Sequence, residues 1–300
     1  MLAAYFRPRI GWVAVLRRTV AEIDEDRCFG LAAQLAFYFF LSLFPALLFL
    51  VALVGLLPVQ EQLEQFLFGL EIIAPREVID VVREQLRQSA AGSGGSILTV
   101  GVVGAIWSSS AAMVAIIDTL NDAFDVVERR PWWKRRIVAV GLTLGLAVFI
   151  LTSFVLLLLG PGGMRWAAGY MGLDPAFATA WRLLRWPVIV FLLVLAVDLV
   201  YHLAPNRRAR WVWFTPGSLL ATGLWIVTSM GFKVYVQNYG QYSATYGALG
   251  GMLVLLLWFY LSALALLVGA ELDGVLYQAW LRADPERVAG TRRGSGRGAA

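Results

Sequence analysis

Asp198 is the first residue of this chain that could do chemistry, because it lies inside an otherwise apolar stretch. A charged side chain in the middle of a membrane costs about 3 kcal/mol or more unless it is paired or hydrated. His202 follows four residues later, so a helix places both side chains on one face. Asp198 is therefore expected to face protein or a water-filled cavity. The alternative is structural, since Asp198 lies near the end of its stretch and could pair with Arg207 or Arg208.

Several other polar or helix-breaking residues could line a polar pathway together with Asp198. Pro45 lacks a backbone donor in mid-stretch, and three serines follow Trp107. The segment from Tyr235 to Gly247 carries four tyrosines and no charge, as a segment that caps a cavity mouth would. The alternatives are helix packing for the proline and serines and an interfacial anchor for the tyrosines. The candidate pathway consists of Pro45, Ser108, Ser109, Ser110, Asp198, His202, Asn238, Tyr242 and Tyr246.

An acidic stripe lies just beyond the second apolar stretch and is followed by arginines. Asp118, Asn121, Asp122 and Asp125 recur at spacings of three and four residues, which places them on one side of a helix. Carboxylates in such a stripe could hold a hard cation. The favoured interpretation is a structural latch, in which the acids pair with neighbouring arginines. The candidate latch consists of Asp118, Asn121, Asp122, Asp125, Glu128, Arg129 and Arg130.

The chain carries none of the common enzyme motifs. GxSxG, HExxH, the phosphate-binding loop and the dinucleotide fingerprint are all absent from the sequence. A single cysteine excludes an intramolecular disulfide, and one cysteine with one histidine leaves no Cys/His zinc cluster. The sequence therefore predicts no catalysis, no metal site and no cofactor.

Long stretches without charge are the elements that must position these residues. The stretch from Cys28 to Gln60 carries no charged side chain, and the chain as a whole is 59% hydrophobic and 15% charged, unlike a soluble protein. The sequence predicts an all-α polytopic membrane protein with six transmembrane helices. The expected spans are 31–57, 95–117, 137–159, 186–203, 211–232 and 248–270.

The distribution of basic residues predicts how these spans are oriented. If the connections alternate between two sides, 18 of the 25 Lys and Arg residues fall on the side that holds both termini. Basic residues mark the cytoplasmic side of membrane proteins, so both termini are expected in the cytoplasm. The expected organisation is a cytoplasmic segment 1–30, a membrane domain 31–270 and a cytoplasmic tail 271–300, disordered after about residue 289.

Two further features concern connections and packing. Apolar residues at helical spacing predict two short amphipathic helices in the 58–94 connection. Two GxxxG pairs, Gly141 with Gly145 and Gly247 with Gly251, predict close packing between helices, with no functional role required.

Nine sequence blocks together resemble the YihY/BrkB family of bacterial membrane proteins, once labelled ribonuclease BN. The resemblance covers about residues 10–280, and the family is similar in having six predicted helices in the cytoplasmic membrane. The blocks are 36–45 (AFYFFLSLFP), 107–110 (WSSS), 120–126 (LNDAFDV), 128–131 (ERRP), 201–206 (YHLAPN), 215–218 (TPGS), 246–250 (YGALG), 258–261 (WFYL) and 269–272 (GAEL).

The interpretation that follows is a permease-like transporter of the bacterial cytoplasmic membrane, for a solute or lipid that the sequence does not name. A non-transporting envelope scaffold that binds lipids or partner proteins is the alternative, and a membrane ribonuclease is disfavoured. The expected partners are the bilayer, with anionic lipids at the arginine-rich loops, and no nucleic acid. Homo-oligomer formation stays open.

Overall fold

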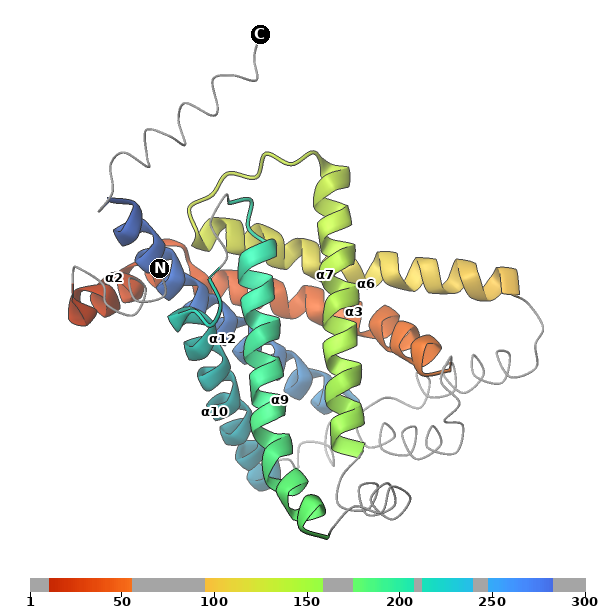
Figure 1. Cartoon of the computed structure of the whole chain (residues 1–300). Helices are drawn as coiled ribbons and strands as arrows, with labels where there is room; N and C mark the ends of the chain where they lie inside the picture. The colour runs from red at the N-terminus through yellow and green to blue at the C-terminus, as the bar shows by residue number, and fades with distance from the viewer. Residues whose placement is uncertain (1–10, 56–94, 159–174, 208–211, 240–247, 283–300) are drawn as a thin grey trace.

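The computed structural model describes residues 11–55, 95–158, 175–207, 212–239 and 248–282, which form seven helices (Figure 1). Six of them overlap the six predicted spans, so the predicted helix positions are confirmed. The helix before the first span is an addition that the sequence interpretation lacks. The helices are α2 (Trp12–Glu25), α3 (Cys28–Gly55), α6 (Gly95–Ala123), α7 (Trp132–Leu158), α9 (Pro175–Leu203), α10 (Pro216–Tyr239) and α12 (Ala248–Arg282).

Two prolines mark the starts of helices. Two others lie inside helices that continue past them. Pro175 and Pro216 occupy the first positions of α9 and α10, where the missing N–H costs nothing. The predicted span 186–203 starts too late, because α9 begins at Pro175 and contains Pro187 in its interior. A proline there removes one backbone hydrogen bond, and the apolar residues on both sides continue the helix. Pro45 lies inside α3, as predicted.

The long helices have the length and composition of membrane-spanning segments. Among the described residues, four helical segments are long and apolar enough to cross a membrane: Trp132–Ser153, Leu183–Leu203, Pro216–Val236 and Gly250–Trp280. A shorter apolar helical run covers Cys28–Leu43. Large apolar side chains on these helices face outward, among them Val148, Leu183, Val227 and Leu253. So much exposed apolar surface fits a polytopic protein in lipid.

The six long helices form a ring in which each packs against the next in sequence, and α12 closes the ring by packing against α3. In addition, α12 contacts α6 across the ring, and α2 packs on α12 and α3. Figure 1 shows α3 and α6 running across the direction of α7 and α9. The helix α12 therefore contacts more of the other helices than any other element described.

Buried residues concentrate at one end of the ring, which we call the packed end. It comprises the starts of α3, α7 and α10 and the ends of α6, α9 and α12. Among residues whose burial is described, α3 buries none after Ala36 and α10 none after Thr222. In α12 all but Gly250 of the buried residues lie from Ala263 onward. Among the residues whose burial is described, the opposite halves of α3, α10 and α12 therefore contribute almost no core, and we call that end of the ring the loosely packed end.

The packed end gathers segments that the charge pattern assigns to one side of the membrane. Cys28 contacts Glu271, Asn121 contacts Asn206, and Arg130 contacts the Ala204 carbonyl. These contacts join the start of α3, the end of α6 and the α6–α7 connection, the α9–α10 connection and the end of α12.

Glycines let backbones meet at the packed end. A Cβ on Gly217 would lie 2.2 Å from the Gly269 carbonyl oxygen, and one on Gly269 would lie 2.5 Å from that of Gly217. A Cβ on Gly274 would lie 2.5 Å from the Ala123 carbonyl oxygen. The crossings of α10 with α12 and of α12 with α6 thus require glycine.

The predicted GxxxG pairs do not make such crossings. A Cβ on Gly141 or Gly251 would meet no atom within 4 Å, and one on Gly145 would reach only Leu199 at 3.9 Å. That prediction is therefore wrong for these three positions, because the GxxxG pattern does not specify which helix face meets a neighbour. Gly247, the 58–94 connection and the tail after 282 lie outside the described residues.

Candidate functional site at the packed end

The start of α10 is capped by its own first residues. Thr215 precedes the helix, and its Oγ1 accepts a hydrogen bond from the Ser218 N–H at 3.2 Å. Its carbonyl accepts from the Leu219 N–H at 3.1 Å. Pro216 has no N–H to satisfy, which leaves the Gly217 N–H as the donor that needs a partner from elsewhere. The TPGS block is therefore a helix cap.

Asp198 binds the turn that leads into this cap. The Phe214 N–H donates to its Oδ2, and the Thr215 N–H and hydroxyl donate to its Oδ1, each at 3.3 Å. Phe214 has a φ of 56°, a left-handed conformation that turns the chain toward the carboxylate. Asp198 is 2% exposed. Its contacts are those of a structural anchor between α9 and α10.

The predicted partners of Asp198 are Arg207, Arg208 and His202, and the structure describes two of them. Arg207 donates from Nη2 to the Tyr201 carbonyl at 3.0 Å. Arg208 lies outside the described residues. His202 lies close enough for an electrostatic interaction with Asp198.

Two further buried acids, Glu271 and Asp273, lie beyond the predicted spans and are not among the predicted site residues. Asp273 Oδ1 accepts from the Gly217 N–H at 2.8 Å and completes the α10 cap. Glu271 Oε1 accepts from the Cys28 thiol at 3.2 Å. Asp273 is 1% exposed and Glu271 is 2% exposed. The predicted span stops at residue 270 because it ends at the first charge, whereas α12 continues to Arg282.

Tyr201 and Arg207 complete the buried polar group. The Tyr201 hydroxyl donates to the Leu266 carbonyl, and its ring packs edge-on against Phe124. The Arg207 guanidinium lies 4.0 Å from the Phe124 ring centroid and 5.4 Å from that of Tyr277. Cation–π contacts of this kind hold the arginine between α6 and α12 without an ion pair.

The candidate latch begins where α6 ends. The Val126 N–H donates to the Asn121 carbonyl at 2.8 Å and the Asp125 N–H to the Asp122 carbonyl at 2.9 Å. Asp125 has a φ of 50°. This paired pattern with a left-handed residue is a common helix C-terminal motif. It reverses the chain so that Glu128 faces back toward Asn121.

Glu128 is the centre of the latch. It forms an ion pair with Arg130 at 2.7 Å and accepts from Asn121 Nδ2 at 3.0 Å. Arg130 also donates to the Ala204 carbonyl at 2.7 Å, and the Asn206 N–H donates to Asn121 Oδ1 at 2.8 Å. Burial alone raises the pKa of Glu128, but these hydrogen bonds from Arg130 and Asn121 outweigh it and lower the pKa to about 2. The latch thus joins the α6–α7 and α9–α10 connections.

The remaining latch residues lie nearer the solvent. Asp118 pairs with Arg135 at 2.8 Å, but the two side chains are 47% and 32% exposed, so the pair contributes little stability. Gln278 of α12 donates to Asp125. Asp122 and Arg129 are exposed. Glu128 thus pairs with an arginine of the predicted set, whereas Asp118 pairs with Arg135 outside it, and the latch as a functional unit stays a prediction.

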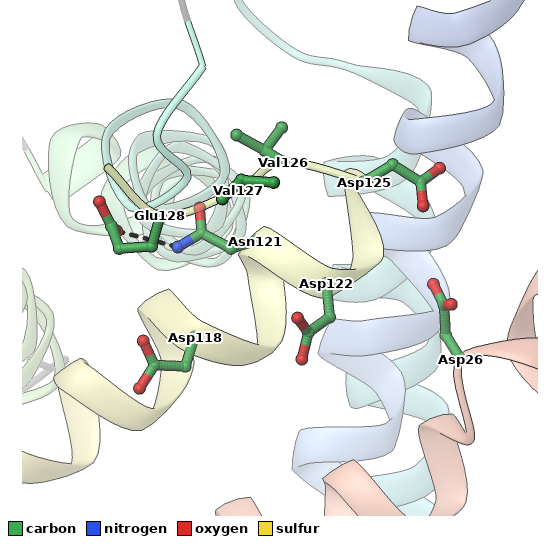
Figure 2. A pocket seen from close by; sticks show the side chains of 8 residues that line it. All are labelled: Asp26, Asp118, Asn121, Asp122, Asp125, Val126, Val127 and Glu128. Carbon is green, nitrogen blue, oxygen red and sulfur yellow. Dashed lines mark hydrogen bonds between the residues drawn. The ribbon is translucent and has the colours of Figure 1, made fainter. Parts of the chain in front are cut away.

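An acidic pocket of about 750 Å³ lies beside the latch (Figure 2). Its charged lining comes from the end of α6, from Glu128 and from Asp26 in the turn between α2 and α3. Figure 2 shows Asp26 pointing toward Asp125 from across the pocket. Burial, followed by repulsion from Asp125 and Glu22, raises the pKa of Asp26 to about 6. The lining residues are Asp26, Asp118, Asn121, Asp122, Asp125, Val126, Val127 and Glu128.

The raised pKa of Asp26 predicts that Asp26→Asn stabilises the protein at neutral pH. Ionisation of this carboxyl disfavours the folded state, so the stability of the neutral form is fully present below pH about 3.8 and is lost as pH rises through about 6. The variant should therefore melt above the wild type at pH about 7 and together with it at pH about 4. Thermal unfolding in detergent, followed by tryptophan fluorescence, checks this. Equal melting temperatures at both pH values would contradict it.

Removing the Arg130 side chain should loosen the packed end. Arg130→Ala removes the guanidinium that donates to Glu128 and to the Ala204 carbonyl and leaves Glu128 with the weaker Asn121 and backbone donors, which costs about 2 kcal/mol. The melting temperature should fall by about 4 to 8 °C. Arg129→Ala is the matched control, because Arg129 is exposed. A wild-type melting temperature for Arg130→Ala would show that the latch does not hold these connections.

The candidate pathway residues occupy different parts of the fold. Ser109 and Ser110 are buried and donate to the Ile106 and Trp107 carbonyls of their own helix, while Ser108 is exposed. Asn238 lies on α10, and Tyr242 and Tyr246 lie outside the described residues. The described members of the set lie on α3, α6, α9 and α10, and the pathway stays a prediction.

Within the part of the chain that the structure describes, no group of three or more His, Cys, Asp or Glu side chains is arranged to hold a metal ion. The acidic pocket lies beside basic side chains that pair with two of its carboxylates. The ion pairs and hydrogen bonds of its lining residues join chain segments to one another.

Comparisons with known proteins identify the family. The family model described as virulence factor BrkB matches residues 19–292. A Bacillus subtilis protein, YfkH, named as ribonuclease-like, is 34% identical over 247 residues, covering 82% of this chain and 89% of YfkH. A protein of Cronobacter sakazakii named UPF0761 membrane protein is 29% identical over 281 residues, covering 90% of this chain and 89% of its own. No solved structure matches the chain. The chain therefore belongs to the virulence factor BrkB family, which includes UPF0761 membrane proteins.

Proposed function

We propose that this protein is a permease-like transporter with six spans in the bacterial cytoplasmic membrane, carrying a solute or a lipid. The concentration of buried residues at the packed end is the observation that supports this most. A bundle that is closed at one end and loosely packed at the other has the form that alternating access requires. A protein that only holds other proteins in place has no need of this asymmetry.

The orientation belongs to the same proposal. Arginines gather in the connections at the packed end, and the positive-inside rule places such connections in the cytoplasm. The exposed Arg17 and Arg18 of α2 lie at the same end, where anionic lipid headgroups would attract them. The closed end is then cytoplasmic and the loosely packed end faces outward.

Reconstitution tests the transport proposal. Purified protein is placed in liposomes, and two readouts are followed: efflux of an entrapped set of radiolabelled amino acids, sugars and ions, and scrambling of a fluorescent phosphatidylethanolamine. The wild type should move at least one of these faster than protein-free liposomes. Arg130→Ala, which loosens the closed end, should raise that rate, and Arg129→Ala should not. Rates equal to protein-free liposomes for every probe would contradict transport.

The second candidate is a non-transporting scaffold that binds lipids or partner proteins. It is favoured by the Asp198 contacts, since this carboxylate is fully engaged in joining two helices. The absence of any flux, together with lipids copurifying in fixed ratio to the protein, would support it over transport.

Catalysis is not part of the proposal, although one relative is named as ribonuclease-like. Phosphodiester hydrolysis usually employs a metal held by clustered ligands beside a groove for RNA. RNA cleavage by rigorously purified protein that is lost in Asp122→Ala would establish the nuclease instead.

A further inference from the structure

Two buried carboxylates, Asp198 and Asp273, meet at the start of α10. They come from α9 and α12 and bind successive donors of the α10 cap. The Thr215 hydroxyl donates to Asp198 at 3.3 Å and also lies within reach of Asp273. One hydroxyl proton therefore serves two acids.

The hydrogen bonds of the two carboxylates are unequal. Asp198 has donors on both oxygens. Asp273 has the Gly217 N–H on Oδ1, while its buried Oδ2 has no partner. An ionised carboxylate with an unsatisfied oxygen in a dry site is costly, and two carboxylates that share a site resist ionising together. A proton on Asp273 Oδ2 relieves both costs.

The groups that face this pair come from every neighbouring element. Tyr201 of α9 and Glu271 of α12 interact electrostatically within the same cluster, and His202 faces Asp198. Arg207 is the cation that acts on Asp273 among the described residues, and it donates to the Tyr201 carbonyl. The cluster thus holds three acids, and Arg207 acts on one of them, Asp273.

The space around Asp273 suits a proton better than a metal ion. A Cβ on Gly217 would lie 2.4 Å from Asp273 Cγ and 2.2 Å from the Gly269 carbonyl oxygen. Cations such as Ca²⁺ or Mg²⁺ need about six oxygen ligands around them. Backbones this close leave no volume for such a shell, whereas a proton needs none.

We infer that Asp198 and Asp273 form a proton-binding pair, in which Asp273 carries an exchangeable proton that couples transport to a proton gradient. On loading, a hydronium ion gives its proton to Asp273 Oδ2 and becomes water, so one O–H bond breaks as the other forms; on release, the proton returns to a water molecule. The coupling role rests on the proposed transport function. Proton binding by the pair does not depend on whether the protein transports anything.

The α10 face that meets α12 offers a route to this pair from the loosely packed end. Thr222 and Ser229 lie on that face, and both hydroxyl oxygens are buried without a partner. Between them Trp225 Nε1 donates to Ser262 of α12 at 3.1 Å, which shows that this face meets α12. Buried hydroxyls without partners are sites where water is held, and linked waters pass protons.

Infrared difference spectroscopy of the full-length protein in detergent tests proton binding directly. Between pH about 5 and about 9, the range over which buried carboxyls titrate, the wild type should show the C=O band of a protonated carboxylic acid appear and vanish. Asp26 also titrates in this range, so the variants are compared in an Asp26→Asn background. There the band should lose intensity in Asp273→Asn and keep it in Asp24→Asn, whose exposed carboxyl is the control. A band unchanged in Asp273→Asn, or one displaced by Na⁺ at constant pH, would overturn the inference.

The folding of Asp273→Asn is itself informative. An asparagine keeps an acceptor for the Gly217 N–H and places a neutral NH₂ where the protonated oxygen lies. The variant should therefore elute as wild-type protein on gel filtration and melt at a similar temperature. Unfolding of this variant alone would show that Asp273 is ionised, and the inference would fail.

Two outcomes separate this inference from the transport proposal. A titrating Asp273 in a protein that moves no probe leaves proton binding intact and removes transport. Flux that is insensitive to a pH gradient in both wild type and Asp273→Asn removes the coupling role. For the route, Thr222→Val should slow hydrogen–deuterium exchange of the band, while Thr228→Val, whose hydroxyl donates to its own helix, should not. Equal exchange rates would remove the route.

Discussion

Gly217→Ala and Gly269→Ala should each prevent stable folding of the bundle. The new Cβ would lie 2.2 Å from the Gly269 carbonyl oxygen in the first case and 2.5 Å from that of Gly217 in the second. Backbone atoms at a helix crossing cannot rotate away as a side chain can, so the helices must separate. Overpacking of this kind costs about 3 kcal/mol or more. Gel filtration of the detergent-solubilised protein and its melting temperature measure the effect.

Gly223→Ala and Gly251→Ala are the matched controls for this prediction. They lie on the same two helices, α10 and α12, and a Cβ on either would meet no atom within 4 Å. Both should leave the melting temperature unchanged or raise it, since alanine favours helix. Wild-type elution and melting of Gly217→Ala and Gly269→Ala would contradict the close crossing of α10 and α12.

Asp198→Ala should have the second largest effect. It removes the acceptor for the Phe214 and Thr215 N–H groups and for the Thr215 hydroxyl. Each buried donor left without a partner costs about 1 to 3 kcal/mol, so the loss should be roughly 3 to 5 kcal/mol after partial relaxation. The melting temperature should fall by about 10 °C or more.

Two further variants extend this prediction: Asp198→Asn should have an intermediate effect, and Ser109→Ala is the control. Asparagine keeps one acceptor oxygen, so its melting temperature should lie between those of wild type and Asp198→Ala. Ser109 is buried but donates only within its own helix, to Ile106, and its replacement should cost little. A loss of flux in Asp198→Ala without any loss of stability would contradict its structural role and leave only its part in the proton-binding pair.

Charge-free stretches were sufficient to locate the long helices, for a physical reason. A backbone in lipid must satisfy its hydrogen bonds internally, so a long apolar stretch has few alternatives to helix. The same reasoning misplaces helix ends, because α12 passes beyond Glu271 and Asp273 once packing partners satisfy them. The helix α2 has no charge-free stretch, and only its apolar spacing could have predicted it.

The candidate site was predictable only where its contacts are local. The acidic stripe from Asp118 to Asp125 follows from helical spacing, and the pair of Glu128 with Arg130 joins neighbours in sequence. The contacts of Asn121 with Asn206 and of Asp198 with the α10 cap depend on how distant helices cross. Those crossings are set by Gly217, Gly269 and Gly274, which look like any other glycines in an apolar sequence.

Thiol labelling in intact cells tests the central claim, that the packed end is cytoplasmic and the opposite ends of the helices face outward. Two single-cysteine variants are made in a Cys28→Ser background, which keeps the donor to Glu271. Lys233→Cys probes the far end of α10, and Asp122→Cys probes the pocket at the packed end; both positions are exposed. A membrane-impermeant maleimide should label Lys233→Cys in intact cells and Asp122→Cys only after the membrane is opened. Labelling of both variants from the same side, or of Asp122→Cys alone in intact cells, would contradict the account.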